Sequence, residues 1–211
     1  MAWPRRAGFP VSLIGHGGTV YGLPHAAVVS ESHPTDPISA YGVTKLAAEK
    51  YLKMYHHLYG LEYAILRPSV PYGPRQNPSR RQGAVAVFTH RALRGEPVAI
   101  WGDGSAVRDY FCVEAMIPAL LEAMAVPFAG EMTFNLAGSR GYSLLELVDS
   151  VEEATGTRLQ VEFKPARRFD VPSLRLDTTA ATERLGWTPT TGLVEGIRRM
   201  AGWMRTQRFD T

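Results

Sequence analysis

Residues 36–66 of this 211-residue chain, DPISAYGVTKLAAEKYLKMYHHLYGLEYAIL, indicate a helix followed by a buried strand. Asp36 followed by Pro37 is a typical helix start, with an N-cap residue before a proline at the first helical position. Gly60 is placed to end the helix. Residues 61–66 are mostly apolar with little alternation, which predicts a strand buried on both faces, as in a parallel sheet. The predicted apolar stripe of the helix consists of Val43, Leu46, Ala47, Leu52, Tyr55 and Leu58.

The first turns of this helix carry the motif Tyr41-Gly42-Val43-Thr44-Lys45. A tyrosine and a lysine four residues apart share one face of a helix. The ammonium group of Lys45 beside the phenol predicts a pKa for Tyr41 below its usual value of ~10. Tyr41 would then accept a proton near neutral pH. An ordinary exposed Tyr/Lys pair has the same spacing, so the motif needs support from the rest of the chain.

Strand and helix patterns alternate along the chain, which predicts an α/β fold built from right-handed crossover units. Pro118 is expected to kink its helix unless it falls in the first turn. The glycine-rich turn at 15–18 is not expected to open a helix, and the arginine-rich segment 71–82 is either a functional loop or an exposed basic loop. Further strands are expected at 11–14, 98–101, 132–136 and 159–163, and further helices at 83–93, 114–124, 143–156, 177–185 and 193–206.

Composition limits the classes of protein to which the chain can belong. It is 45% hydrophobic and 20% charged, which is an ordinary globular balance. A net charge of +3, spread along the chain, argues against a nucleic-acid partner and suits an anionic small ligand. The single cysteine, Cys112, fits a reducing cytoplasm and a place in the core. No membrane span, signal peptide or metal site is expected.

Several further motifs, taken in order, resemble the NAD-dependent epimerase/dehydratase family of extended short-chain dehydrogenases, and UDP-glucose 4-epimerases within it. The match extends from about residue 12 to residue 205. Its motifs are Gly17-Gly18-Thr19-Val20-Tyr21-Gly22, Glu31, Tyr41 with Lys45 and Glu49, Arg67-Pro68-Ser69, Tyr72-Gly73-Pro74-Arg75-Gln76, Trp101-Gly102-Asp103-Gly104, Arg108-Asp109-Tyr110, Phe169-Asp170-Val171-Pro172, Asp177, and Leu185-Gly186-Trp187 with Pro189.

The resemblance implies an NAD-dependent reaction on a UDP-sugar, with a hydride removed from and returned to the sugar C4 through a keto intermediate. It makes Tyr41 the acid/base, with Lys45 holding the nicotinamide ribose. Thr19 is the nearest hydroxyl that could polarise the sugar oxygen, and Pro68 lies at the cofactor. For the substrate, the resemblance implies that Arg108 and Arg167 clamp the diphosphate, while Ala99 and Trp101 flank the uracil. Either arginine taken alone would be an ordinary surface charge.

The resemblance also implies the domain organisation. Residues 11–82 would form the C-terminal part of a Rossmann-like parallel sheet, and 83–211 a smaller mixed α/β substrate-binding region interleaved with the last core strands. Residues 1–10 do not resemble the family and are interpreted as a displaced start or reading frame. A homodimer through the helix that bears Tyr41 is a further expectation.

Three departures from the family pattern are visible. No glycine-rich dinucleotide fingerprint follows a strand near the N-terminus, and the acidic residue for the adenosine ribose is missing with it. Gly15-His16 stands where the family usually carries hydroxyl residues, and Val70 where it often has asparagine. The alternative to an active epimerase is therefore an inactive truncated homologue or a nucleotide-sugar-binding fragment without tight NAD binding. A 4,6-dehydratase ranks lower, because Gly18-Thr19 replaces the usual Asp-Glu pair.

Overall fold

The computed structural model describes residues 11–14, 17–78, 83–127, 130, 132–166 and 171–209. The ten N-terminal residues predicted to fall outside the family match lie outside this described part. The strands are β1 Val11–Ile14, β2 Tyr63–Pro68, β3 Val70–Tyr72, β4 Val98–Trp101, β5 Val107–Arg108, β6 Tyr110–Cys112, β7 Thr133–Leu136, β8 Tyr142–Ser143, β9 Val161–Lys164 and β10 Ser173–Leu174. The helices are α1 Gly17–Val20, α2 Ala40–Tyr59, α3 Ala84–Arg94, α4 Met116–Ala125, α5 Leu144–Thr155, α6 Thr179–Leu185 and α7 Leu193–Arg205, and a 3₁₀ turn, η2, covers Val113–Ala115.

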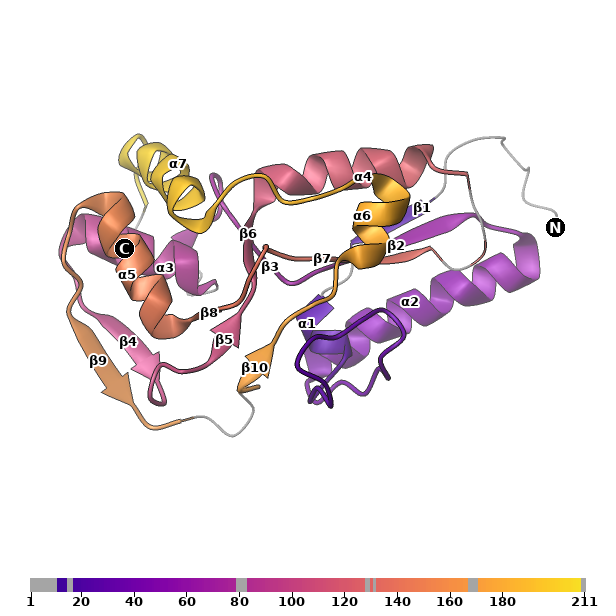
Figure 1. Cartoon of the computed structure of the whole chain (residues 1–211), viewed down its shortest axis with the longest axis horizontal. Coiled ribbons are helices and arrows are strands. Elements are labelled where there is room, and N and C mark those ends of the chain that lie inside the picture. The colour runs from indigo at the N-terminus through magenta and orange to yellow at the C-terminus, as the bar shows by residue number, and fades with distance from the viewer. Residues whose placement is uncertain are drawn as a thin grey trace.

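A three-stranded parallel sheet in the order β1-β2-β7 organises one end of the molecule. Figure 1 shows α2 on one face of this sheet and α4 with α6 on the other, so the sheet is covered on both sides. All six residues of β2 are buried, as predicted for a central parallel strand. The α/β fold with a Rossmann-like parallel sheet is therefore confirmed.

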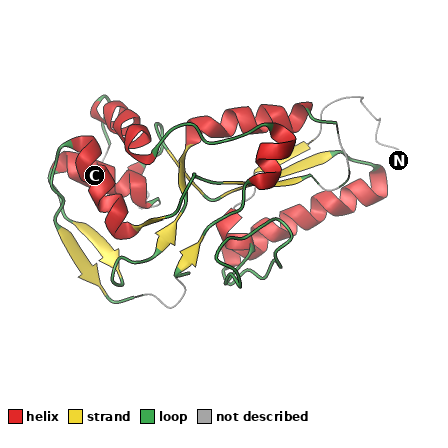
Figure 2. Cartoon of the chain, in the orientation of Figure 1, coloured by secondary structure: helices red, strands yellow, loops and turns green. Residues whose placement is uncertain are grey.

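Helices α3, α5 and α7 gather at the other end of the molecule, beside the parallel pair β4-β9 (Figure 2). Their core includes Phe88, Leu147, Ile197 and Met200. Parallel pairing also joins β3 to β6 and β5 to β10, whereas β5 and β8 are antiparallel. No two described strands form a hairpin. The domain boundary between residues 82 and 83 stays a prediction.

Helix ends follow the expected capping chemistry in several places. Ser143 forms a complete capping box with Glu146 at the start of α5. Gly60, Gly95 and Gly156 end α2, α3 and α5 in the left-handed conformation that glycine favours. These stop signals were located from the sequence, and they set the lengths of three of the main helices.

Several predicted helix starts are wrong. Helix α2 begins at Ala40, because the Ser39 hydroxyl, and not Asp36, accepts the amide of Gly42. Residues 17–20 form a helical turn where none was expected. Helix α6 has Thr178 as its N-cap, although the carboxylate of Asp177 accepts the Thr179 amide at 2.9 Å.

Two further expectations concern helices α4 and α7. Pro118 falls in the first turn of α4, where the absent N–H leaves no hydrogen bond unmade, so the proline fits the helix. Helix α7 starts after Gly192, with no side-chain cap from Thr191. Of the predicted loop 71–82, the first two residues belong to β3 and 79–82 lie outside the described residues.

The predicted apolar stripe of α2 faces the core only in part: Leu46 and Leu52 are half-buried, and Leu46 packs against a core cluster. Val43, Tyr55 and Leu58 are exposed, and the buried residues of the helix are Gly42 and Glu49. Cys112 is buried, as expected, and burial raises the pKa of its thiol. In the described part of the chain, no helix combines the length and hydropathy needed to cross a bilayer.

Candidate active site

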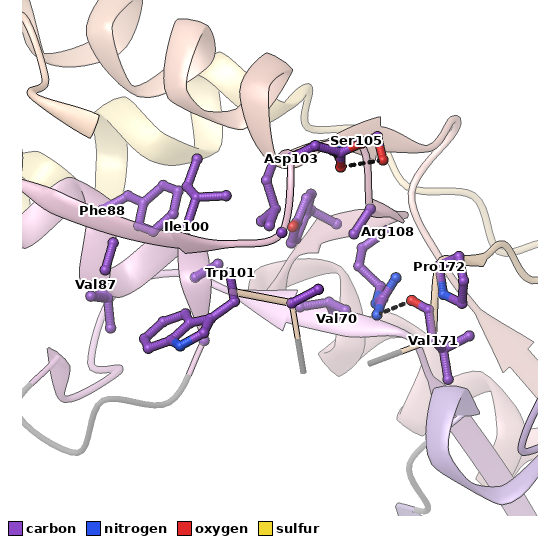
Figure 3. Close-up of a pocket in the computed structure, with 18 of the residues that line it drawn as sticks. Val70, Val87, Phe88, Ile100, Trp101, Asp103, Ser105, Arg108, Val171 and Pro172 are labelled. Atoms are coloured by element: carbon purple, nitrogen blue, oxygen red, sulfur yellow. Dashed lines mark hydrogen bonds between the residues drawn. The ribbon is translucent and has the colours of Figure 1, made fainter. Parts of the chain in front are cut away.

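A pocket of about 810 Å³ lies between helix α3, strand β4 and the segment around Val171. Three of the four predicted substrate-binding residues line it: Ala99, Trp101 and Arg108. The fourth, Arg167, lies outside the described residues. Most of the exposed lining is apolar, with Val87 and Phe88 from α3 facing Ile100 from β4 (Figure 3). An apolar pocket with a few polar groups is typical of a small-molecule site.

Arg108 is held at the wall of this pocket by two backbone carbonyls. One guanidinium nitrogen donates to the Val107 carbonyl at 2.7 Å. Another donates to the Val171 carbonyl at 2.7 Å, as Figure 3 shows. A guanidinium group has five N–H donors, so donors remain for a ligand. Fixing the fork in advance reduces the entropy lost when an anion binds.

Trp101 and Ala99 come from β4, whose alternating pattern of buried and partly exposed residues brings both to one side of the strand. Trp101 is 43% exposed, and its ring lies away from Arg108 in the view of Figure 3. The pocket therefore offers an aromatic face at one place and a cation at another. Such a site can take a ligand that has a flat ring and an anionic group.

The lining also contains residues that the sequence analysis did not select. The Tyr110 side chain is buried, and among the described residues its hydroxyl has no hydrogen-bond partner. Burial raises the pKa of Tyr110 to about 12. Arg91 on α3 and Glu162 on β9 add one charge of each sign. These residues come from elements that are distant in the sequence. The sequence could have indicated Tyr110, because it belongs to the quoted Arg108-Asp109-Tyr110 motif.

Tyr41 and Lys45 lie together, as their spacing predicts, with the Lys45 Nζ 5.5 Å from the centroid of the Tyr41 ring. They do not line the pocket described above, and Tyr41 is 47% exposed. The predicted direction of the Tyr41 pKa is wrong. Desolvation by burial raises this pKa above its usual value, so at neutral pH the phenol carries its proton.

Thr19 and Pro68 complete the set of predicted site residues. Thr19 is in α1, packed against the first turn of α2, where its carbonyl is so close to Gly42 that a Cβ at Gly42 would overlap it. Pro68 is buried at the carboxyl end of β2, the edge at which parallel sheets bind ligands. The structure thus brings Tyr41, Lys45 and Thr19 to one region and Ala99, Trp101 and Arg108 to another. The Gly15-His16 position falls outside the described residues.

A buried polar network beneath α2 was not predicted. It joins Glu49 on α2 to Arg67 on β2, and Arg67 to Tyr21 and Asn135. An arginine within an otherwise apolar strand demands a buried partner, and this signal was available in the sequence around Arg67. Among the described residues, no three His, Cys, Asp or Glu side chains gather as metal ligands.

A family model described as GDP-mannose 4,6 dehydratase matches residues 17–200. The chain belongs to the NAD-dependent epimerase/dehydratase family. The resemblance inferred from the motifs is confirmed.

Relatives of this epimerase/dehydratase chain include the UDP-glucose 4-epimerase of Mycolicibacterium smegmatis, which is 40% identical over 191 residues, or 90% of this chain and 61% of the relative. Among solved structures, the UDP-glucose 4-epimerase of Thermotoga maritima with UDP-glucose matches with a TM-score of 0.88 and 39% identity, over 92% of this chain and 63% of that one. The Thermus thermophilus enzyme in complex with NAD matches with a TM-score of 0.84 and 34% identity, over 92% of this chain and 63% of that one. The chain thus spans about three fifths of the length of these relatives, and NAD is the cofactor of the family.

Proposed function

We propose that this chain carries the substrate-binding and proton-transfer parts of an NAD-dependent UDP-sugar 4-epimerase that acts on UDP-glucose and UDP-galactose. The observation that supports the proposal most is that one pocket gathers Ala99, Trp101 and Arg108. These positions match the family's uracil and diphosphate contacts, and the relatives named above are UDP-glucose 4-epimerases.

In this proposal the Arg108 guanidinium binds the diphosphate, whose paired oxygens suit its planar fork better than an ammonium group would. Trp101 and Ala99 flank the uracil, and the exposed indole face provides a stacking surface. The apolar wall formed by Val87 and Phe88 excludes water from the base. Arg167 is proposed as the second diphosphate contact.

Tyr41 is the proposed acid/base for the sugar hydroxyl at C4, with Thr19 as the hydroxyl that polarises the sugar oxygen. The donor set on this side suits a nicotinamide ribose, because the Lys45 ammonium lies beside the Tyr41 phenol and can donate to a diol. Tyr41, Lys45 and Pro68 would hold that part of NAD, which when bound supplies hydride transfer at the sugar carbon. Tyr41 would accept the C4 hydroxyl proton when the hydride leaves the sugar carbon, and return it when the keto group is reduced.

A nucleotide-sugar-binding protein without tight NAD binding is the second candidate. This candidate is favoured by the distance between the pocket and the proton-transfer residues, because the residues that line the pocket do not include Tyr41, Lys45 or Thr19. A 4,6-dehydratase stays a third candidate, since the matching family model carries that description.

The test begins with calorimetric titration of UDP into the chain and its variants. Arg108→Lys should weaken UDP binding about ten- to hundredfold, because one ammonium cannot replace the fork. Arg140→Lys is the matched control, because Arg140 is exposed and pairs with Glu146 outside the pocket. Equal affinity in the wild type and Arg108→Lys would contradict the assignment of the pocket.

Conversion of UDP-galactose to UDP-glucose in the presence of NAD then separates the candidates. Turnover that is lost in Tyr41→Phe supports the epimerase. UDP binding without NAD binding or turnover supports the second candidate, and release of a 4-keto-6-deoxy sugar supports the dehydratase.

We propose also that the chain forms a homodimer through the exposed apolar side of α2. This side includes Tyr51, Met54, Tyr55, Leu58 and Tyr59. An exposed apolar patch on a helix is a typical site of association between chains.

A further inference from the structure

Helix α2 is attached to the rest of the molecule by few of its own side chains. Only Gly42 and Glu49 are buried among its 20 residues. An amphipathic helix is normally held by its apolar face, but much of the apolar surface of α2 is exposed, with Tyr51 61% and Leu58 56% exposed. Leu46, which is partly buried, packs against a core cluster. Within a single chain, a polar contact can therefore contribute much to fixing the position of this helix, and with it the position of Tyr41.

Glu49 makes that contact with Arg67 on strand β2. The Arg67 Nε donates to Glu49 Oε1 at 3.0 Å, and the Arg67 Nη2 donates to Glu49 Oε2 at 2.6 Å. The Glu49 side chain is 1% exposed and the Arg67 side chain is 5% exposed. Tyr41, Lys45 and Glu49 follow one another at four-residue intervals, which places them along one side of the helix. The ion pair therefore holds the same side of α2 that presents the proton-transfer residues.

The third donor of Arg67 connects the pair to the rest of the molecule. Its Nη1 donates to the Tyr21 hydroxyl at 2.7 Å, and that hydroxyl donates to Asn135 Oδ1 at 2.7 Å. The Asn135 amide side chain donates to the Val29 carbonyl at 3.0 Å, while its backbone N–H donates to Glu31 at 2.7 Å. Both oxygens of Glu49 and all three hydrogen-bonding nitrogens of Arg67 thus have partners.

We propose that Glu49 and Arg67 are positioning residues for the reaction: their two-point ion pair sets the rotation and axial position of α2, and hence the place of Tyr41 and Lys45 relative to α1 and β2. The effect on turnover rests on the function proposed above. The effect on the place of Tyr41 does not depend on turnover and can be measured without it.

Energetics favour a positioning role over a purely stabilising one. Taking two charges out of water offsets much of their attraction, so an apolar pair of similar volume often supports a fold as well as a buried ion pair does. An apolar pair, however, has no directional requirement, whereas a guanidinium–carboxylate pair with two parallel hydrogen bonds is planar and specific in direction. Replacing the pair by apolar side chains should therefore separate stability from position.

The start of α2 leaves little room for displacement. Gly42 packs against the Thr19 carbonyl and lies against the Pro37 ring, where a Cβ would come within 2.8 Å of the proline Cβ. A small movement of α2 must open or strain this contact, and it must also change how far the Tyr41 phenol is desolvated. The titration of Tyr41 is therefore a direct readout of how α2 is seated.

The experiment follows the Tyr41 phenol by NMR of the full chain labelled with ¹³Cζ-tyrosine, with Tyr41→Phe identifying the signal. The variants are Glu49→Gln, Arg67→Lys, which keeps the charge but loses the fork, and the apolar double variant Glu49→Leu/Arg67→Met. Glu195→Gln is the matched control, because Glu195 forms an exposed ion pair with Arg199 on α7. Urea unfolding is measured for each variant.

We expect the Tyr41 pKa to fall toward about 10 in all three variants and to stay unchanged in Glu195→Gln. The double variant should resist urea better than Glu49→Gln without recovering the Tyr41 titration. Where the wild type turns over, kcat should fall about ten- to hundredfold, with KM within twofold because Ala99, Trp101 and Arg108 lie on other elements.

Two results would overturn the positioning role. One is a wild-type Tyr41 titration in a folded Glu49→Gln or Arg67→Lys variant. The other is recovery of both stability and titration in the apolar double variant, which would mean that packing alone seats the helix. If Glu49→Gln does not fold, Arg67→Lys and the double variant decide the question. An inactive wild type would count against the proposed function and would leave the titration result valid.

Discussion

At the scale of single residues, Val70 lies in the pocket wall at the position where the family often carries asparagine. We expect Val70→Asn to tighten UDP-glucose binding about two- to tenfold, because the amide supplies a hydrogen bond that valine cannot make. Calorimetric titration measures the change. Val87→Asn, on the α3 side of the same pocket, is the control and should bring no gain. Tighter binding in both variants, or in neither, would count against a sugar contact at residue 70.

Asp109, next to the pocket residue Arg108, gives a prediction about pH. Its Oδ2 accepts the Leu176 amide at 2.7 Å, while its Oδ1 is buried with no partner among the described residues. Burial raises its pKa to about 6, above the value of about 3.9 in an unfolded chain. The folded state therefore binds the proton more tightly, and the free energy of unfolding should fall as pH rises from about 4 to about 6.

Asp109→Asn should remove this slope and stabilise the protein at pH 7 by about 2–3 kcal/mol. Urea unfolding between pH 4 and 8 measures the effect. The control Asp177→Asn should have the opposite sign, because hydrogen bonds from Thr179 lower the pKa of Asp177, so that its ionised form stabilises the fold at neutral pH. An unchanged slope in Asp109→Asn would show that this carboxyl is not the group responsible.

At the scale of elements, the contact between α1 and α2 is sensitive to a single added methyl group. Gly42→Ala should destabilise the protein by about 1–3 kcal/mol, because its Cβ would overlap the Thr19 carbonyl. Gly202→Ala on α7 is the matched control, since a Cβ there meets nothing within 4 Å. In that helix interior alanine should add about 0.5–1 kcal/mol of stability. Thermal unfolding of both variants measures the contrast, and equal effects would contradict the close packing of α1 on α2.

Helix ends and the central strand could be predicted because their signals are local. Gly60, Gly156 and the Ser143 capping box each act within one helical turn, and the apolar run of β2 predicts burial without knowledge of its neighbours. The start of α2 was mistaken because Asp36-Pro37 has the composition of a helix start, whereas the Ser39 hydroxyl forms the cap.

The site was predicted in part for a similar reason. Motifs identified Arg108 and Trp101 as pocket residues, since their type and order are characteristic of the family. The predicted direction of the Tyr41 pKa shift was wrong, because the sequence shows the neighbouring Lys45 but does not show the desolvation of the phenol. Desolvation has the larger effect on this pKa. Tyr110 and Arg67 stand in motifs that the sequence shows. The burial of the Tyr110 hydroxyl and the pairing of Arg67 with Glu49 depend on packing between distant segments, which no single window of sequence contains.

At the scale of the whole molecule, the apolar side of α2 predicts self-association. Replacing both Tyr51 and Leu58 by glutamate should convert a dimer to a monomer, because two charges would have to be buried in the interface. Sedimentation velocity at micromolar concentration measures the change. Ile117→Glu is the control, since Ile117 is 63% exposed on α4 and lies on the other side of the sheet. A monomeric wild type, or an equal effect of Ile117→Glu, would contradict the proposed interface.

The absence of hairpins among the described strands has a consequence for biosynthesis. Strand β4 pairs with β9, and β2 with β7, so each waits for a segment that leaves the ribosome much later. Such distant pairing slows folding and leaves apolar edges open on the nascent polypeptide. Assembly of these sheets therefore waits for the later strands, and chaperones that shield unpaired strands should raise the yield of native protein.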